Sequence, residues 1–185
     1  MRKIFIFILL FSCHLNVKSD NLFVSFSASV EKIIDGDTII VNSLENLSNF
    51  SIFSNQVYVV RLLYIDAPET KENERFERFL DKLYKKEIFL KRNEIIELGN
   101  LALSNLSNIL KKDDIISVSF NPQNQFDNYG RILALVYKDK ININLYQVET
   151  GYAFCYFYNQ KKDKKFINAE NIAKKNKKGL WKYFN

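Results

Sequence analysis

An apolar run at residues 57–65, VYVVRLLYI, constrains the fold more than any other part of this sequence. Its β-branched and aromatic residues are typical of a buried strand. The strand must end before Pro68, which cannot donate a hydrogen bond to a sheet ladder. Three charged residues, Arg61, Asp66 and Glu69, stand within this run or directly after it. Neither a buried strand nor a turn requires them, so we expect them to serve a functional site.

Further short strands and helices surround this run. A chain of 185 residues with 47% hydrophobic residues can bury one core, and no linker rich in Gly, Pro or Ser divides it. Several short strands with helices between and after them favour a small β-barrel with helices, of the α+β class. The residue patterns predict strands at 24–34, 38–41, 57–65, 115–120 and 132–137, and helices at 98–110, 142–150 and 166–178.

Two segments interrupt this pattern. Residues 43–56 are rich in Asn and Ser and predict a loop or an extended hairpin tip. Residues 71–97 alternate charges too densely for a core, and we interpret them as an exposed helical excursion. Because this excursion directly follows Glu69, it can lie over the site to which Glu69 belongs and alter substrate access.

The first 19 residues are typical of a secretory signal peptide. A positively charged start precedes an apolar stretch at 4–11 that is too short to span a bilayer, and small residues favour cleavage after Ser19. An alternative is a bacterial lipobox that ends at Cys13, which would leave a lipidated N-terminus associated with a membrane. An uncleaved anchor and a first strand are the remaining alternatives. We expect residues 20–185 to be exported, either secreted, periplasmic or anchored to the cell surface by lipid.

Cleavage after Ser19 restricts the chemistry that the mature chain can perform. It removes His14, which is the only histidine, and Cys13, which leaves Cys155 as the single thiol. A Ser-His-Asp triad, a Cys-His pair, a histidine-metal nuclease centre, a zinc-thiolate site and an internal disulfide are excluded. Any chemistry must come from carboxylates, arginine, lysine, tyrosine or a hard metal ion.

The net charge of +6 is unevenly distributed along the chain. Residues 161–185 contain nine lysines against Asp163 and Glu170, whereas residues 20–160 are net acidic. A basic tail suits binding to a polyanion or to an anionic membrane surface. The alternative without a binding function is a solvated helix face.

Two further motifs contain an acid or an arginine that local structure does not require. Residues 33–41, IIDGDTIIV, contain a good hairpin turn, but Asp37 begins the next strand and the turn does not need it. Residues 126–134, FDNYGRILA, combine a turn with Arg131. Taken singly, each motif has a structural explanation as a turn, a helix cap or a surface charge.

Taken together, the motifs meet the needs of phosphodiester hydrolysis. Asp37 and Asp66 are hard oxygen ligands suited to Ca²⁺. Glu69 lies three residues beyond Asp66 and can polarise a water without binding the metal. Arg61 and Arg131 supply planar guanidinium groups for phosphate oxygens. A base, a metal and two arginines are the groups needed for attack of water on a phosphodiester.

The order of these motifs resembles the staphylococcal nuclease (thermonuclease) family. DGDT alone is weakly specific, but the ordered set is highly specific and covers most of residues 27–183. The resemblance implies a five-stranded OB-fold β-barrel with about three helices. It also implies a Ca²⁺-dependent endonuclease that acts on DNA and RNA. The motifs are DGDT at 35–38, RLLYIDAPET at 61–70, DNYGR at 127–131 and AENIAKKNKKGLW at 169–181.

The resemblance also implies a role for individual residues. The implied metal ligands are Asp37, Asp66 and the backbone carbonyl of Ala67, which stands where the family often has threonine. Glu69 matches the general base, and Arg61 and Arg131 match the catalytic arginines that bind the phosphate. Asp35 resembles a supporting acid near the metal. The aromatic side chains expected to pack on the nucleotide are Tyr129, Tyr156 and Tyr158.

The sequence departs from the family in the length of two segments. Residues 43–56 and 71–97 are longer than in compact members of the family.

A non-catalytic OB-fold module that binds nucleic acid or a protein is the alternative function, although the complete set of acids and arginines favours catalysis. A surface protein whose lysines at 161–178 bind anionic lipid is a third hypothesis. We expect a monomer that acts on DNA and RNA without a protein partner, and loss of activity without unfolding when Arg61 or Glu69 is replaced.

Overall fold

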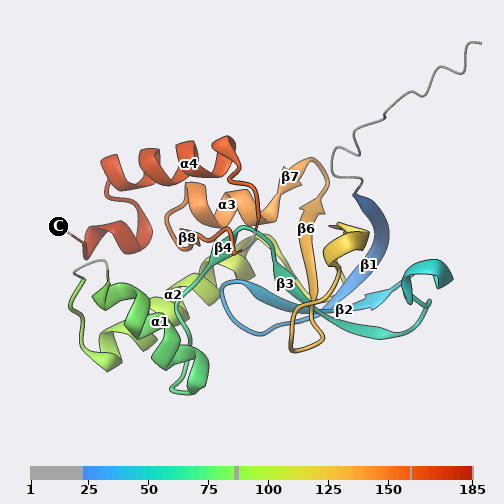
Figure 1. Cartoon of the computed structure of the whole chain (residues 1–185), viewed down its shortest axis with the longest axis horizontal. Coiled ribbons are helices and arrows are strands. Elements are labelled where there is room, and N and C mark those ends of the chain that lie inside the picture. Colours follow the sequence, from blue (N-terminus) through green and yellow to red (C-terminus); the bar gives the residue numbers. More distant parts are fainter. Residues whose placement is uncertain (1–22, 86–87, 159, 185) are drawn as a thin grey trace, which may run out of the picture.

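The computed structural model describes residues 23–85, 88–158 and 160–184. The predicted signal peptide at 1–19, including Cys13, lies outside the described residues. A β-barrel occupies one end of the long axis of the molecule, and the helices gather at the other end (Figure 1). Its five main strands are β1 (Val24–Ile33), β2 (Thr38–Ser43), β3 (Val57–Leu62), β5 (Ile115–Phe120) and β6 (Ile132–Lys138).

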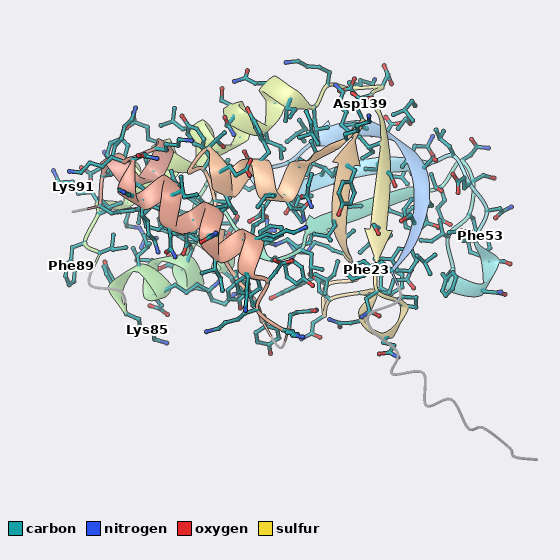
Figure 2. All side chains as sticks on the ribbon, turned by 90° about the horizontal axis from the view of Figure 1, so that it is seen from above. Phe23, Phe53, Lys85, Phe89, Lys91 and Asp139 are labelled. Carbon is teal, nitrogen blue, oxygen red and sulfur yellow. The ribbon has the colours of Figure 1, made fainter. Side chains whose placement is uncertain are left out.

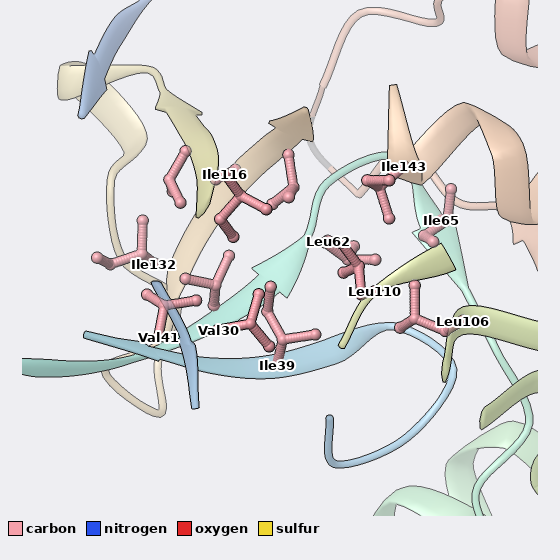
Figure 3. Packing of buried hydrophobic residues seen from close by; sticks show 14 of the residues in the cluster. Val30, Ile39, Val41, Leu62, Ile65, Leu106, Leu110, Ile116, Ile132 and Ile143 are labelled. Atoms are coloured by element: carbon pink, nitrogen blue, oxygen red, sulfur yellow. The ribbon is translucent and has the colours of Figure 1, made fainter. Parts of the chain in front are cut away.

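The five main strands close into a barrel, which confirms the predicted OB-fold of the α+β class. β1 pairs antiparallel with β2 and β5, β2 pairs with β3, and β5 pairs with β6. A parallel pairing between β3 and β6, with Val60 opposite Ile132, completes the circle. The short strand β7 (Ile141–Asn142) extends β6 at its far end. Alternating apolar side chains from all five strands fill the interior, as Figure 3 shows.

The run at 57–65 is not one continuous strand, contrary to the sequence prediction. β3 ends at Leu62, and Tyr64 adopts a left-handed backbone conformation with φ of 69°. The chain then forms β4 (Ile65–Asp66), which pairs with β8 (Phe154–Cys155) outside the barrel. The Tyr64 ring packs against Phe157 and Phe166, with centroids 5.4 Å away in each case. This break turns the segment that follows away from the barrel wall.

Four α-helices lie within the described residues: the three predicted individually and an additional one within the predicted helical excursion. They are α1 (Glu74–Tyr84), α2 (Arg92–Ile109), α3 (Ile143–Glu149) and α4 (Lys164–Lys175), with short 3-10 helices at η1 (Ser48–Phe50), η2 (Pro122–Asn124) and η3 (Gly179–Lys182). No helix in the described part of the chain is both long and apolar enough to span a membrane. The additional helix is α1, which belongs to the excursion at 71–97.

The excursion is not simply exposed, because α1 helps to build a second hydrophobic core. Four apolar side chains of α1, at positions 76, 79, 80 and 83, are buried against α2, β8 and η3. Their spacing of three and four residues is the mark of an amphipathic helix, which the dense charges on the opposite face obscured in the sequence. The ring of Phe79 packs on Phe154 at 5.7 Å.

The two segments that seemed long for the family lie at opposite ends of the molecule. The loop at 43–56 carries η1 and a short bridge between Leu47 and Ile52. Figure 2 places Phe53 of this loop at one end and Phe89, which follows α1, at the other. The helical excursion reaches the predicted site residues, because Arg75 lies 3.5 Å from Glu69 and Lys82 lies 2.7 Å from Asp66.

Candidate active site

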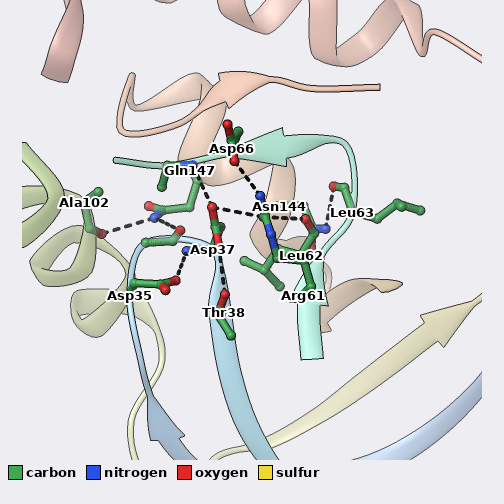
Figure 4. Close-up of polar contacts among 12 residues, drawn as sticks. Asp35, Asp37, Thr38, Arg61, Leu62, Leu63, Asp66, Ala102, Asn144 and Gln147 are labelled. Carbon is green, nitrogen blue, oxygen red and sulfur yellow. Dashed lines mark hydrogen bonds and ion pairs between the residues drawn. The ribbon is translucent and has the colours of Figure 1, made fainter. Parts of the chain in front are cut away.

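Arg61 lies at the centre of a buried cluster of carboxylates (Figure 4). Its Nη1 is 3.0 Å from Oδ2 of Asp37, and its Nη2 is 2.7 Å from Oδ1 of Asp66. The pairing of β2 with β3 sets Thr38 opposite Arg61 and so brings Asp37 alongside it. Asp66 arrives from β4, beyond the break in the chain at Tyr64. An acid from the turn between β1 and β2 and an acid from β4 thus meet at one guanidinium group.

The turn that carries Asp35 and Asp37 is held from several sides. Oδ1 of Asp35 accepts the backbone N–H of Asp37 at 3.1 Å. Oδ2 of Asp37 accepts the backbone N–H of Ala67 at 2.7 Å, which joins the turn to the segment after β4. Gly36 is packed so closely that a Cβ there would lie 2.7 Å from the Cβ atoms of Ala67 and Ala102. This hydrogen bond and the close packing at Gly36 therefore fix the spacing between the two predicted ligand segments.

Negative charge is concentrated at this point and is only partly neutralised. Burial raises the pKa of Asp37 to about 7, Arg61 opposes this increase, and the carboxylates of Asp35 and Asp66 add to it. Burial acts to lower the pKa of Arg61, yet Asp37 and then Asp66 raise it above its ordinary value. The arginine therefore stays charged, and the buried acids around it favour the approach of a further cation.

The donor atoms at this cluster fit a hard cation. The carboxylates of Asp37 and Asp66 and the adjacent carbonyl of Ala67 are the oxygen donors that Ca²⁺ prefers, with water completing its six to eight ligands. The described residues contain no preformed group of three or more acidic, histidine or cysteine ligands. Instead, Arg61 binds both acids, and Nζ of Lys82 lies 2.7 Å from Oδ2 of Asp66. An ion at this place would share the carboxylates with these two side chains.

Glu69 lies beside the cluster on a segment that packs directly on α2. A Cβ at Gly99 would lie only 2.2 Å from the carbonyl oxygen of Glu69, so only glycine allows this approach. The Glu69 carboxylate faces Nε of Arg75 at 3.5 Å and Nδ2 of Asn73 at 3.4 Å. Burial raises the pKa of Glu69, Arg75 holds the increase back, and Asp37 adds to it. A carboxylate with a raised pKa is a better proton acceptor.

Arg131 lies on the loop before β6, in a different segment from Arg61 and Glu69. Its Nε donates to Oδ2 of Asp127 at 2.7 Å, and the backbone N–H of Arg131 donates to Oδ1 of the same residue. The guanidinium lies 5.5 Å from the centre of the Tyr129 ring. The positive φ of Gly130, 76°, turns the chain between these two side chains. Asp127 therefore orients Arg131, and the Tyr129 ring stays 65% exposed beside it.

Tyr156 and Tyr158 form an exposed aromatic pair at the edge of β8. Their rings stack with centroids 6.2 Å apart and an interplanar angle of 17°. Both side chains are exposed, whereas the ring of Phe157 between them packs against Tyr64. Nζ of Lys82 lies 4.0 Å from the centre of the Tyr156 ring, a cation–π contact that connects the pair to α1.

A cavity of about 430 Å³ brings most of these residues together. Asp35, Asp37 and Ala67 are buried behind Arg61 and are absent from its lining, although they contact residues that line it. The predicted site residues that line the cavity are Arg61, Asp66, Glu69, Tyr129, Arg131, Tyr156 and Tyr158. The site predicted from separate motifs is therefore one continuous place in the structure.

Comparison with protein families identifies the family to which this fold belongs. The model of the family described as staphylococcal nuclease homologue matches residues 59–183 of the chain. The chain belongs to this family. The match begins within β3 and ends after η3, so it includes both arginines, Asp66, Glu69 and the paired tyrosines.

Curated relatives of this staphylococcal nuclease homologue come from archaea and bacteria. An uncharacterized protein of Methanocaldococcus jannaschii is 30% identical over 172 residues, which cover 86% of this chain and 73% of the relative. Endonuclease YhcR of Bacillus subtilis is 28% identical over 161 residues, 84% of this chain but 11% of that protein. Endonuclease YncB of Bacillus subtilis is 27% identical over 158 residues, with 84% and 61% covered. The chain thus spans less than two thirds of either Bacillus endonuclease.

Several residues that hold the candidate active site in place did not stand out in the sequence. Nδ2 of Asn144 donates to the carbonyl of Leu63 at 2.9 Å, and Nε2 of Gln147 donates to the carbonyl of Gly36 at 2.7 Å. Both side chains are fully buried on α3 and fix the ends of the strands that carry the acids. Nothing in their local sequence marks them. The cations that α1 adds to the cavity are Arg75, Arg78 and Lys82.

Proposed function

We propose that this staphylococcal nuclease homologue is a Ca²⁺-dependent endonuclease that hydrolyses phosphodiester bonds of DNA and RNA. One observation supports this proposal above all others. Arg61, Glu69 and Arg131, which come from three separate segments, line one cavity together with Asp66. A base and two guanidinium groups around a single space suit the attack of water on a phosphodiester.

Glu69 acts as the general base in this proposal. It accepts a proton from the attacking water as the water oxygen forms its bond to phosphorus, and the bond to the leaving ester oxygen breaks. The leaving oxygen then takes a proton from solvent. Arg75 and Asn73 hold the Glu69 carboxylate, and the packing of Gly99 against its backbone fixes its position. These contacts reduce the motion of the base before reaction.

The two arginines neutralise the charge that develops on the phosphate. Arg61 is tied to Asp37 and Asp66, and Arg131 is tied to Asp127, so both guanidinium groups are oriented before substrate arrives. Preorganised donors of this kind typically contribute about 10²–10³-fold in rate each. Asp37, Asp66 and the carbonyl of Ala67 would hold Ca²⁺, with Asp35 supporting Asp37. Bound there, the ion would polarise the phosphate and lower the pKa of water.

The test is cleavage of single-stranded DNA and RNA by the purified protein, with Ca²⁺ and then with chelator. We expect cleavage that the chelator abolishes and that Glu69→Gln lowers by at least about 10²-fold. Glu69→Gln keeps the shape of the side chain and removes its basicity, so its fold can be compared directly by circular dichroism. Wild-type rates in the Glu69→Gln protein would overturn the role of Glu69. Binding without any cleavage by the wild-type protein would favour the alternative, a non-catalytic OB-fold module for nucleic acid or protein.

We further propose that the protein is exported as a monomer. The basis is the charged and apolar pattern of residues 1–19, with cleavage after Ser19 or lipidation at Cys13. Cell fractionation and N-terminal sequencing of the mature protein separate these two outcomes, since only the lipidated form partitions into detergent. An intact N-terminus in the cytoplasm would contradict export, and sedimentation measurements would test the monomer.

A further inference from the structure

One face of α1 carries three cations, and each contacts a different part of the candidate active site. Arg75, Arg78 and Lys82 are three and four positions apart, which places them on the same side of the helix. Arg75 faces Glu69, Arg78 donates to the Tyr129 hydroxyl at 3.1 Å, and Lys82 binds Asp66. The opposite face of α1 is buried in the second hydrophobic core, so this orientation is fixed.

A second cavity of about 480 Å³ lies on the other side of Lys82. Asp66, Phe79, Lys82, Tyr156 and Tyr158 line both cavities, so the two spaces meet at these side chains. The residues that line the second cavity but not the first are Leu83, Lys85, Phe154, Cys155, Phe157 and Lys162. Lys85 follows the last turn of α1, at the end of the molecule labelled in Figure 2.

The lining of the second cavity combines the two chemistries that a nucleotide needs. Its floor is mainly apolar and aromatic, and aromatic side chains stack on bases without regard to sequence. Lys82, Lys85 and Lys162 add three positive charges at its edge, which suit phosphate oxygens. Its volume falls within the range of about 300–1,000 Å³ typical of small-ligand sites.

We propose that the second cavity binds a nucleotide of an unpaired strand, next to the nucleotide whose scissile phosphate lies in the first cavity. Lys82 contacts the phosphate that joins the nucleotide in the first cavity to the nucleotide in the second. This inference rests on the proposed nuclease function and extends the site by one position. The base lies against the aromatic floor beside Tyr158, and Lys162 contacts the next phosphate. The contact with the Tyr156 ring holds Lys82 at the junction of the cavities, so less side-chain entropy remains to be lost on binding.

The test measures binding in the Glu69→Gln background, in which bound substrate stays intact. A fluorescein-labelled oligothymidylate is titrated with protein in Ca²⁺ at several salt concentrations, and the slope of log K against log salt is taken from anisotropy. Each phosphate contact on a single strand contributes about 0.7 to this slope. We expect Lys82→Gln and Lys162→Gln each to reduce the slope by about 0.7, and Lys82→Arg to restore it. Lys175→Gln is the matched control, because Lys175 is exposed on α4 in the same basic tail and lines neither cavity.

A second measurement separates this inference from the proposed function. We expect addition of one nucleotide to a short oligothymidylate to tighten binding in the Glu69→Gln protein, and this gain to be lost in the Lys162→Gln variant. Equal slopes and equal length dependence in the Lys162→Gln and Lys175→Gln variants would overturn the subsite. If this occurred while wild-type protein still cleaved DNA, the nuclease would stand and the subsite alone would fall. If wild-type protein cleaved nothing, the nuclease proposal would fail whatever the slopes.

Discussion

Nη1 of Arg61 lies 3.0 Å from Oδ2 of Asp37, and both side chains are almost completely withdrawn from solvent. The same guanidinium also binds Asp66 and donates to the carbonyl of Leu62. An arginine in this position neutralises acids that are largely withdrawn from water. Its removal affects the fold as well as the chemistry, because the acids would remain buried without their partner.

Replacement of Arg61 is therefore expected to destabilise the protein, in contrast to the expectation from sequence alone. Arg61→Gln should lower the free energy of unfolding by about 3–5 kcal/mol, since it breaks a buried ion pair by removing one partner. Urea denaturation at pH 7 measures this change. Arg92→Gln is the control: Arg92 pairs with Glu72 and Glu77 at the exposed surface, where solvent screens the ion pairs and the loss of stability should be much smaller. Equal effects in the two variants would contradict the structural role of Arg61.

The buried carboxylate of Asp37 predicts a particular dependence of stability on pH. Its pKa is about 7 in the folded protein against an ordinary value of 3.8. Between these two values the folded state binds more protons than the unfolded state, so the Asp37 contribution to the free energy of unfolding falls as pH rises from about 4 to 7. Asp35, Arg61 and Asp66 face this group and set the size of the effect.

Asp37→Asn should remove this dependence. We expect the variant to gain stability relative to the wild type as pH rises from 5 to 8, when both are measured in chelator. Thermal unfolding at each pH provides the comparison. A stability difference between the two proteins that stays constant over this range would show that Asp37 does not titrate there.

The close packing of Gly99 against Glu69 predicts that α2 positions the base. A methyl group at this place cannot fit without moving the backbone of Glu69, whose carbonyl would lie 2.2 Å away. Gly99→Ala should lower the rate of cleavage by about 10²-fold, as a displacement of about 1 Å does in a positioned site. Asn100→Ala, on the exposed side of the same helix, controls for helix propensity. Full activity in Gly99→Ala would contradict this role.

The buried amide of Gln147 predicts a cost that local sequence does not reveal. Its Nε2 donates to the carbonyls of Gly36 at 2.7 Å and Ala102 at 3.2 Å. Gln147→Leu leaves the buried carbonyl of Gly36 without this donor and should lower the free energy of unfolding by about 1–3 kcal/mol. Gln123→Leu, at an exposed position, is expected to change stability by less than about 0.5 kcal/mol. Urea denaturation of both variants measures these two changes in the free energy of unfolding.

The pairing of Lys82 with Asp66 predicts competition with a metal ion. Lys82 lies 2.7 Å from a carboxylate oxygen that the proposed Ca²⁺ would also use. Lys82→Gln should therefore bind Ca²⁺ more tightly than the wild type, by several-fold, in calorimetric titrations without substrate. Arg78→Gln changes the charge of the same helix face without a contact to Asp66 in the described structure, and its Ca²⁺ affinity should change less. Weaker Ca²⁺ binding by Lys82→Gln would rule out the competition.

The barrel and its acidic and basic motifs were predictable because their signals are local. The alternation of apolar residues and the Asp35-Gly36 turn predict the strands without reference to the rest of the chain. The break at Tyr64 was not predictable, because it depends on the distant rings of Phe157 and Phe166. The same reason applies to Asn144, whose amide bonds a carbonyl 81 positions away.

The sequence by itself determined the closed barrel and the types of residue available for catalysis. Only the tertiary structure decided how these residues meet, and that α1 joins them. The four apolar side chains of α1 bury themselves in the second core, and this burial fixes which way Arg75, Arg78 and Lys82 face. The alternation of apolar residues along a strand follows from the local geometry of the strand itself, whereas the place of a charged helix depends on the surface that covers its apolar face.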